Sequence, residues 1–167
     1  MELKVELSTS SLSAAREKLE EYIASLPLKA DEGARRMADA GEAQAKASAP
    51  VETGALRLSI QSERWGEGDY RVTARSVDGN GHSYAAFAEF GTGVVGASAG
   101  YPGALPDGYG YGEGQTPKAH QGDGWWFDHP DDGRTFTRGQ AGKHYMADAA
   151  AAMRQCERET MEAAFNG

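Results

Sequence analysis

The residues with the clearest chemical potential lie in one acidic, glycine-rich stretch, where His120, Asp123, Asp128 and His129 fall within ten positions. Imidazole and carboxylate groups bind zinc or calcium when their spacing fits the coordination geometry of the ion. This spacing matches neither a zinc loop nor a calcium loop, and a Pro-Asp-Asp-Gly turn at 130–133 already accounts for the neighbouring aspartates. We therefore expect no metal and no other cofactor.

The candidate nucleophiles are Ser59, Ser83 and Cys156, and none of them lies in a recognisable nucleophile motif. The glycines of GTGVVGASAG at 91–100 do not follow a strand and open a helix, and no lysine is near, so no phosphate-binding loop is predicted. A hydrolase that uses dispersed carboxylates is the least favoured function class. We expect that the protein is not an enzyme.

The aromatic residues between 101 and 126 are candidates for contacts with a partner. Trp125 and Trp126 are adjacent, and neighbours in a strand point to opposite faces, so at most one of them lies in the core. The other can anchor an interface or stack on a sugar or a base. Tyr101, Tyr109 and Tyr111 are interleaved with glycines and join the tryptophans as candidate interface residues. A carbohydrate- or peptide-binding module is therefore the alternative function.

Two charged residues, Arg57 and Glu89, lie among apolar neighbours. Burying an unpaired charge is costly, so a partner is required. We predict that Arg57 reaches Glu89 and forms a structural pair.

The bulk composition limits the class of protein. A chain of 167 residues is about the size of one domain, and we expect a single domain over 1–167. The net charge is −8, and six acids against one lysine between 91 and 133 contribute five of those negative charges. Such a surface disfavours a grip on nucleic acid, which needs clustered cations. The lone cysteine favours a reducing compartment, and we expect neither a signal peptide nor a membrane span.

Three segments on the N-terminal side must position these side chains. Apolar and charged residues alternate over 2–8, which predicts a strand. Apolar residues recur every three or four positions over 11–26, which predicts an amphipathic helix that ends at Pro27. A second helix is predicted over 30–47, and its stripe of small residues permits close packing on the chain's own sheet or on another subunit. Pro50 ends this second helix.

A sharp corner is expected next. Thr53 can cap a turn through its hydroxyl, and Gly54 can adopt a positive φ. The following apolar residues alternate, which predicts a strand over 56–65 that returns over 70–77 as a hairpin. The alternating residues are Leu56, Leu58 and Ile60.

In the second half of the chain, residues 84–90 fit a short helix and an alternating strand equally well, with Gly91 placed as a helix stop. Residues 125–129 and 134–137 are predicted strands. A final helix with an alanine-rich stripe is predicted over 144–165. The fold class is α+β: a small, mostly antiparallel sheet packed by two N-terminal helices and one C-terminal helix.

The segment 94–124 differs in kind from the rest. Residues 91–124 hold 11 of the 22 glycines, and this composition buries too little apolar surface to offset its ordering entropy. We expect an extended loop insertion that another chain holds in place.

Three motifs in register indicate a family. APVETGALRLSI at 49–60, YAAFAEFGTG at 84–93 and GKHYMADAAAAM at 142–153 resemble, in order and spacing, the tail-component family of tailed double-stranded DNA phages. The resemblance covers residues 12–165. The last motif departs from the family, which usually has proline and phenylalanine where this chain has Lys143, His144 and Tyr145, and the loop at 94–124 is longer than usual. The matching positions include Pro50, Val51, Thr53, Gly54, Leu56, Ile60, Tyr84, Glu89, Phe90, Gly91, Thr92, Met146 and Ala149, and Arg57 lies within the first motif.

The resemblance implies a virion structural protein of the neck or head-tail junction, assembled in the host cytoplasm. Family members act in head-tail joining or tail completion, so it implies a homo-oligomeric ring, most simply a hexamer, around the DNA channel. The neighbours would be a head-closure, tail-terminator or tail-tube protein. DNA would pass as cargo without sequence-specific binding, and no membrane would be involved.

Overall fold

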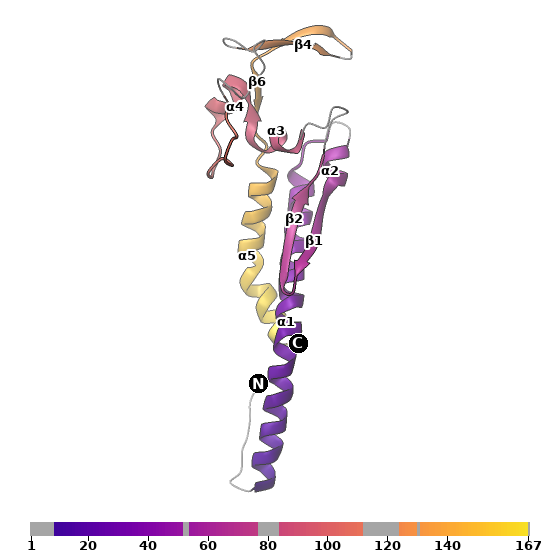
Figure 1. Cartoon of the computed structure of the whole chain (residues 1–167), viewed down its shortest axis with the longest axis vertical. Helices are drawn as coiled ribbons and strands as arrows, with labels where there is room; N and C mark the ends of the chain where they lie inside the picture. Colours follow the sequence, from indigo (N-terminus) through magenta and orange to yellow (C-terminus); the bar gives the residue numbers. More distant parts are fainter. Residues whose placement is uncertain (1–8, 52–53, 77–83, 112–123, 130, 167) are drawn as a thin grey trace.

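The protein is an elongated molecule built along one long helix (Figure 1). The computed structural model describes residues 9–51, 54–76, 84–111, 124–129 and 131–166. Helix α1 spans Thr9–Ser48 and helix α5 spans Tyr145–Asn166. Helix α5 lies beside the C-terminal half of α1, and a β-hairpin lies on another side of the same half (Figure 1). The final helix is therefore confirmed, while the strand predicted over 2–8 lies outside the described residues.

Helix α1 runs through Pro27 without ending. The stop predicted there is wrong, and one long helix replaces the predicted pair. Proline removes one backbone N–H and crowds the carbonyl four residues before it, which costs about 3 kcal/mol in a helix interior. Pro27 is exposed, so water can bond to the freed carbonyl, while the helical turns on both sides keep their geometry. The predicted end before Pro50 is confirmed.

Small residues bring α1 and α5 together. A Cβ added at Gly41 would lie 2.7 Å from the Cγ of Met153, and one added at Gly33 would meet the Sδ of Met161. Ala45 of the same stripe has no exposed surface. Glycine and alanine allow the helix axes to approach, and the methionine side chains then fill the seam. The close packing expected for this stripe is therefore made on a helix of the same chain.

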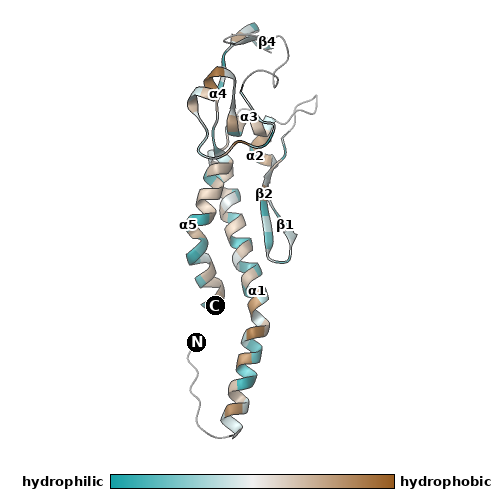
Figure 2. Cartoon of the chain, turned by 60° about the vertical axis from the view of Figure 1, so that its left-hand side comes forward, coloured by the Kyte–Doolittle hydropathy of each residue, from teal (hydrophilic) through white to brown (hydrophobic). Residues whose placement is uncertain are grey.

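The N-terminal half of α1 projects beyond the end of α5 (Figure 1). The seam ends where the Lys29 ammonium donates to the Phe165 carbonyl at 3.1 Å. Beyond that point α1 carries apolar residues and no longer has α5 beside it (Figure 2). Those exposed side chains are Leu12, Leu19, Ile23 and Leu28.

The corner after Pro50 is tighter than predicted. Gly54 adopts φ 78°, as expected, and precedes a single helical turn, α2, over Ala55–Ser59. The Leu58 N–H donates to the Gly54 carbonyl at 3.0 Å, as in a helical turn. The predicted strand start at residue 56 is therefore wrong, because the strand begins at Ile60. Leu56 and Ile60 are buried while Leu58 is exposed. An i, i+4 pair lies on one face of a helix, which a strand reading of the same spacing conceals. The predicted cap at Thr53 lies outside the described residues.

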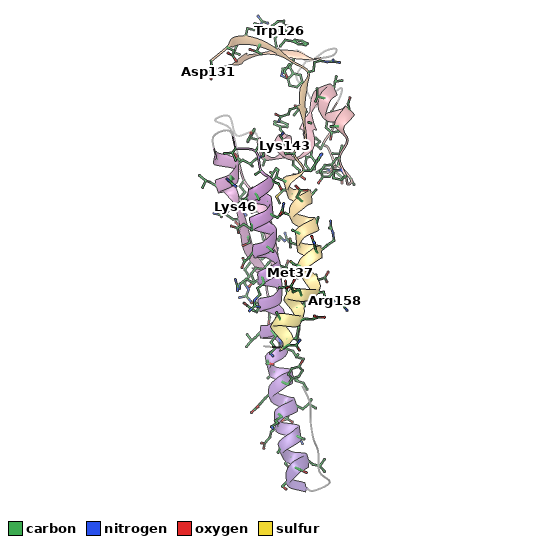
Figure 3. The ribbon with its side chains drawn as sticks, turned by 180° about the vertical axis from the view of Figure 1, so that it is seen from behind. Met37, Lys46, Trp126, Asp131, Lys143 and Arg158 are labelled. Carbon is green, nitrogen blue, oxygen red and sulfur yellow. The ribbon has the colours of Figure 1, made fainter. Side chains whose placement is uncertain are left out.

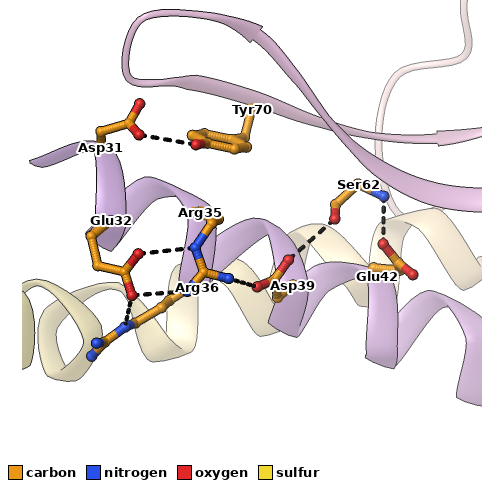
Figure 4. A network of polar contacts seen from close by, with 8 residues as sticks. All are labelled: Asp31, Glu32, Arg35, Arg36, Asp39, Glu42, Ser62 and Tyr70. Carbon is orange, nitrogen blue, oxygen red and sulfur yellow. Dashed lines mark hydrogen bonds and ion pairs between the residues drawn. The ribbon is translucent and has the colours of Figure 1, made fainter. Parts of the chain in front are cut away.

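The predicted hairpin is confirmed. Strand β1, Ile60–Gly66, pairs antiparallel with β2, Asp69–Ala74. Asp31 on α1 holds its turn. The Asp31 carboxylate accepts a hydrogen bond from the Tyr70 hydroxyl at 3.1 Å (Figure 4). It also accepts from the Gly68 N–H and from the Arg64 guanidinium, each at 3.0 Å. The Gly68 N–H contributes most to lowering the pKa of Asp31.

A second set of acids continues along α1. The Ser62 N–H donates to the Glu42 carboxylate, and its hydroxyl donates to Asp39 at 3.2 Å (Figure 4). Between Asp31 and Asp39, the Glu32 carboxylate accepts a hydrogen bond from the Arg35 guanidinium at 2.8 Å, and this bond together with one from Arg36 lowers the pKa of Glu32 to about 2. Asp31, Asp39 and Glu42 thus fix the hairpin along α1.

The residues after the hairpin form a compact upper region. Helix α3 spans Tyr84–Phe90, so the helix is the correct one of the two predicted alternatives, and Gly91 at φ 84° ends it as expected. Strand β3, Gly91–Thr92, pairs antiparallel with β6, Gly139–Ala141, and helix α4 spans Gly93–Ala99. The loop predicted over 94–124 is therefore wrong at its start. Its part at 112–123 lies outside the described residues.

A second hairpin projects from this region (Figure 1). Strand β4, Trp125–His129, pairs antiparallel with β5, Gly133–Thr137, as predicted. The described strands thus form three separate two-stranded antiparallel sheets in place of one small sheet. The α+β class is confirmed.

Candidate interaction site

The three sequence motifs meet at one junction, where the end of α1, helix α3 and the start of α5 pack together. Tyr145 is almost fully buried, and its hydroxyl donates to the Ala85 carbonyl at 3.1 Å. Burial raises the pKa of this hydroxyl well above its usual range. Leu56, Ile60 and Ala149 belong to the same buried cluster, with Met146 and Tyr84 at its edge. This cluster is the hydrophobic core around which the junction packs.

Glu89 stabilises the junction from α3. It is 3 % exposed, and its carboxylate accepts hydrogen bonds from the Met146 N–H at 2.8 Å, the Ala147 N–H at 3.1 Å and the Tyr101 hydroxyl at 3.0 Å. The first N–H groups of a helix have no partner within it and carry a partial positive charge. Glu89 therefore caps α5 from another element, and the buried charge is compensated by backbone and hydroxyl donors.

The predicted Arg57–Glu89 pair is wrong. The Arg57 guanidinium donates instead to the Lys46 carbonyl at 2.8 Å, near the last turn of α1. A cation there bonds to carbonyls that have no partner within the helix. Arg57 thus ties α2 to α1, while Glu89 ties α3 to α5.

The three predicted interface tyrosines pack on their own chain. The Tyr111 hydroxyl donates to the Phe90 carbonyl at 2.8 Å, and the Tyr109 hydroxyl donates to the Gly91 carbonyl, so both satisfy groups at the end of α3. The Phe90 ring lies 4.8 Å from the Tyr101 ring and 4.8 Å from the Tyr109 ring. Burial is the largest cause that raises the pKa values of Tyr101 and Tyr109 to about 12. Residues 101–111 are therefore held by α3, and the expectation that another chain holds this part is wrong.

A pocket of about 300 Å³ opens beside the junction. Its walls come from the first motif, from α3 and from the segment that leads into α5. Pro50 and Val51 supply an apolar side, while Lys143 supplies a cation and is exposed. The backbone N–H of Lys143 donates to the Ala88 carbonyl at 2.8 Å and fixes this segment on α3. The lining residues are Pro50, Val51, Tyr84, Ala88, Gln140, Ala141 and Lys143.

The β4–β5 hairpin separates the two tryptophans as predicted. A Cβ added at Gly93 would lie 2.8 Å from the Trp125 ring, so Trp125 packs on the base of α4. Trp126 is 57 % exposed and points away from the body (Figure 3). Its ring lies 5.3 Å from that of Phe136, which is its partner in the strand register and is also exposed. Of the five candidate interface residues, Trp126 presents the exposed aromatic surface.

The predicted metal candidates are not brought together by any described contact. His120 and Asp123 lie outside the described residues, and Asp128 is exposed on β4. The structure, over the residues it describes, groups no three metal-binding side chains. Ser59 donates to the Leu56 carbonyl, and Cys156 donates to the Met153 carbonyl, so both act within helical turns. None of the described helices is long and apolar enough to cross a bilayer.

Sequence reasoning missed Gln140, Ala141 and the role of Lys143. These residues lie between β5 and α5 in a stretch with no periodic pattern, and Lys143 stands out in the sequence only as a departure from the family motif. Their place in the pocket depends on the pairing of β6 with β3, which no local signal encodes.

One family model matches the part of the chain that supplies two of the three motifs at the junction. Residues 13–91 match the family model described as "Bacteriophage HK97-gp10, putative tail-component". The resemblance to this family is confirmed over those residues. The matched range includes most of α1, the first motif and α3 with Glu89, and over these residues the chain is similar to a phage tail component. No curated protein and no solved structure gives a significant match.

Proposed function

We propose that this protein is a structural component of the phage neck, which joins the head to the tail or completes the tail, and that it forms a homo-oligomeric ring around the DNA channel. The tail-component family match over residues 13–91 is the observation that carries this proposal. The copy number we propose is six, and the neighbours are a head-closure, tail-terminator or tail-tube protein. Assembly takes place in the host cytoplasm.

The exposed apolar surface supports assembly with neighbours. Leu12, Leu19 and Ile23 project on α1 beyond the end of α5, and Trp126 projects at the other end of the molecule (Figures 1 and 3). Large exposed apolar side chains at the two ends of an elongated chain are typical of a subunit with contacts on both sides.

The charge supports a passive role towards DNA. A chain with net charge −8 lacks the clustered cations that bind phosphates through counterion release. If acidic side chains line the channel, DNA can move through the ring without being retained. The proposal requires no chemical step, no cofactor and no membrane.

Electron microscopy of particles tests the proposal directly. The chain is removed from the phage genome and supplied again from a plasmid, and particles are imaged in both cases. We expect separate heads and tails, or unstable joints, without the chain, and labelled density at the head-tail junction when a tagged chain restores assembly. Particles that are complete and infectious without the chain would refute the proposal, and so would a label elsewhere.

The exposed Trp126 keeps a carbohydrate- or peptide-binding module as the alternative function. That module would bind a glycan or a peptide saturably as a monomer, with loss of binding on Trp126→Ala. Glycan-array and peptide-array binding by the purified chain separates the two functions.

A further inference from the structure

The rest of the described chain leaves the outer face of the β4–β5 hairpin exposed, with Trp126 57 % and Phe136 46 % exposed. A two-stranded hairpin alone is marginally stable in water. Trp126 and Phe136 form an exposed aromatic pair on its outer face. Adjacent to this pair the hairpin is acidic, because Asp128, Asp131 and Asp132 outnumber Arg134. The hairpin thus combines an aromatic anchor, which is typical of an interface centre, with negative charge.

The pocket beside the junction has the complementary properties. Pro50, Val51 and Tyr84 give it apolar walls, and Lys143 places a positive charge at its lining. Lys143 forms no ion pair with any carboxylate among the described residues. A pocket of about 300 Å³ accommodates one aromatic side chain, and a nearby cation attracts an acidic segment.

The two surfaces of one chain do not face each other. Strand β6 connects the hairpin to the pocket, and the hairpin extends away from the pocket, with Trp126 at the far end and Lys143 near the start of α5 (Figure 3). An anchor and a receptor at different places on one subunit make a head-to-tail contact, and repeated head-to-tail contacts close into a ring when the rotation allows.

We propose that the Trp126–Phe136 face of the β4–β5 hairpin docks into the pocket lined by Val51 and Lys143 of a second copy of this chain. This inference rests on the proposed self-assembly and names the two surfaces that carry it. Trp126 fills the pocket, and the acidic turn of the hairpin lies near Lys143.

A pair of matched tryptophan variants tests the anchor. Trp126→Ala and Trp65→Ala each remove a tryptophan of similar exposure, 57 % and 60 %, from a hairpin of the same chain. Self-association of the full chain is measured by sedimentation velocity over a concentration series. We expect Trp126→Ala to weaken association at least about tenfold, as for an interface anchor, and Trp65→Ala to leave it within about twofold. Equal effects of the two substitutions would overturn the inference.

Disulfide trapping tests the pairing of the two surfaces. In a Cys156→Ser background, one preparation carries Val51→Cys and another carries Trp126→Cys. We expect an intermolecular disulfide when the two preparations are mixed and oxidised, and none of comparable yield in either preparation alone. Failure to trap the mixed disulfide overturns the inference, whether or not the wild-type chain forms rings.

The two proposals can fail separately. Rings at the head-tail junction without the mixed disulfide would overturn the docking inference and leave the proposed function standing. A mixed disulfide in solution together with no chain in the particles would support the docking inference and refute the proposed function.

Discussion

Replacement of Glu89 by glutamine tests the physical basis of the junction. The carboxylate accepts three hydrogen bonds, from the backbone of Met146 and Ala147 and from the hydroxyl of Tyr101, at a site that is 3 % exposed. Glu89→Gln keeps the side-chain shape, removes the charge and replaces one acceptor oxygen with a donor NH₂ group.

The expected cost follows from these contacts. Loss of a charge at a partly buried helix N-terminus costs up to about 2 kcal/mol. One backbone N–H left unsatisfied in a buried site costs about 1–3 kcal/mol. We therefore expect Glu89→Gln to lower the free energy of unfolding by about 3 kcal/mol, because α5 loses its cap and α3 loses its tie to α5.

Urea unfolding followed by far-UV circular dichroism measures this loss. Glu162→Gln is the matched control on α5, because Glu162 is mostly exposed and its ion-pair partner among the described residues is Arg158 at 3.3 Å. We expect a change below about 0.5 kcal/mol for this control. Tyr101→Phe removes a single hydrogen bond to Glu89 and is expected to cost about 1 kcal/mol. A loss below about 0.5 kcal/mol for Glu89→Gln would refute the capping role.

Three further outcomes are expected. Gly54→Ala and Gly91→Ala both place alanine at a positive φ. A Cβ at Gly91 would lie 2.6 Å from the Gln140 carbonyl oxygen, whereas Gly54 has open space around it. Urea unfolding should therefore show a loss of stability of about 1 kcal/mol for Gly54→Ala and at least about twice that for Gly91→Ala. Because the pKa of Glu32 is lowered from 4.5 to about 2 and that of Asp31 is also lowered, both carboxylates stabilise the fold above their unfolded pKa values. That contribution is lost as the pH falls from 4.5 towards 2, so the melting temperature of the Asp31→Asn, Glu32→Gln variant should fall less steeply over this range than that of the wild-type chain; parallel curves would contradict the assignment. Pro27→Ala restores an N–H that can donate to the Ile23 carbonyl. Hydrogen exchange of residues 9–26 should therefore slow by a factor that reflects up to about 3 kcal/mol of local stability. Unchanged exchange would contradict the continuous helix.

The chain's local patterns determined most of its elements. The hairpin around residue 67, the second hairpin around residue 131 and helix α5 follow from periods of two and 3.6 residues and from turn residues, which depend on a few consecutive positions. Pro50 and Gly54 marked the corner, because one cannot continue the helix and the other adopts a positive φ. The first motif and residues 84–91 of the second motif lie in the range that matches the tail-component family model.

Local patterns misled where packing or solvent decided between alternatives of similar spacing. Leu56 and Ile60 fit one face of a strand or one turn of a helix, and burial of both with Leu58 exposed selects the helix. Pro27 indicates a stop, yet an exposed proline costs one hydrogen bond that water can replace. The split into three small sheets was beyond local reasoning, because strand order depends on contacts between distant segments.

The candidate site depended almost entirely on the tertiary structure. The sequence marked Glu89 as a charge that needs a partner and suggested Arg57. The partner is the N-terminus of α5, at Met146, which lies 57 residues away in the chain. The sequence placed Trp125 and Trp126 on opposite faces of a strand, because alternation in a strand depends on neighbouring residues. The pocket with Lys143, in contrast, forms only when β6 pairs with β3. Element type is encoded in neighbouring residues, while partners, burial and cavities arise from the packing of segments that the sequence keeps far apart.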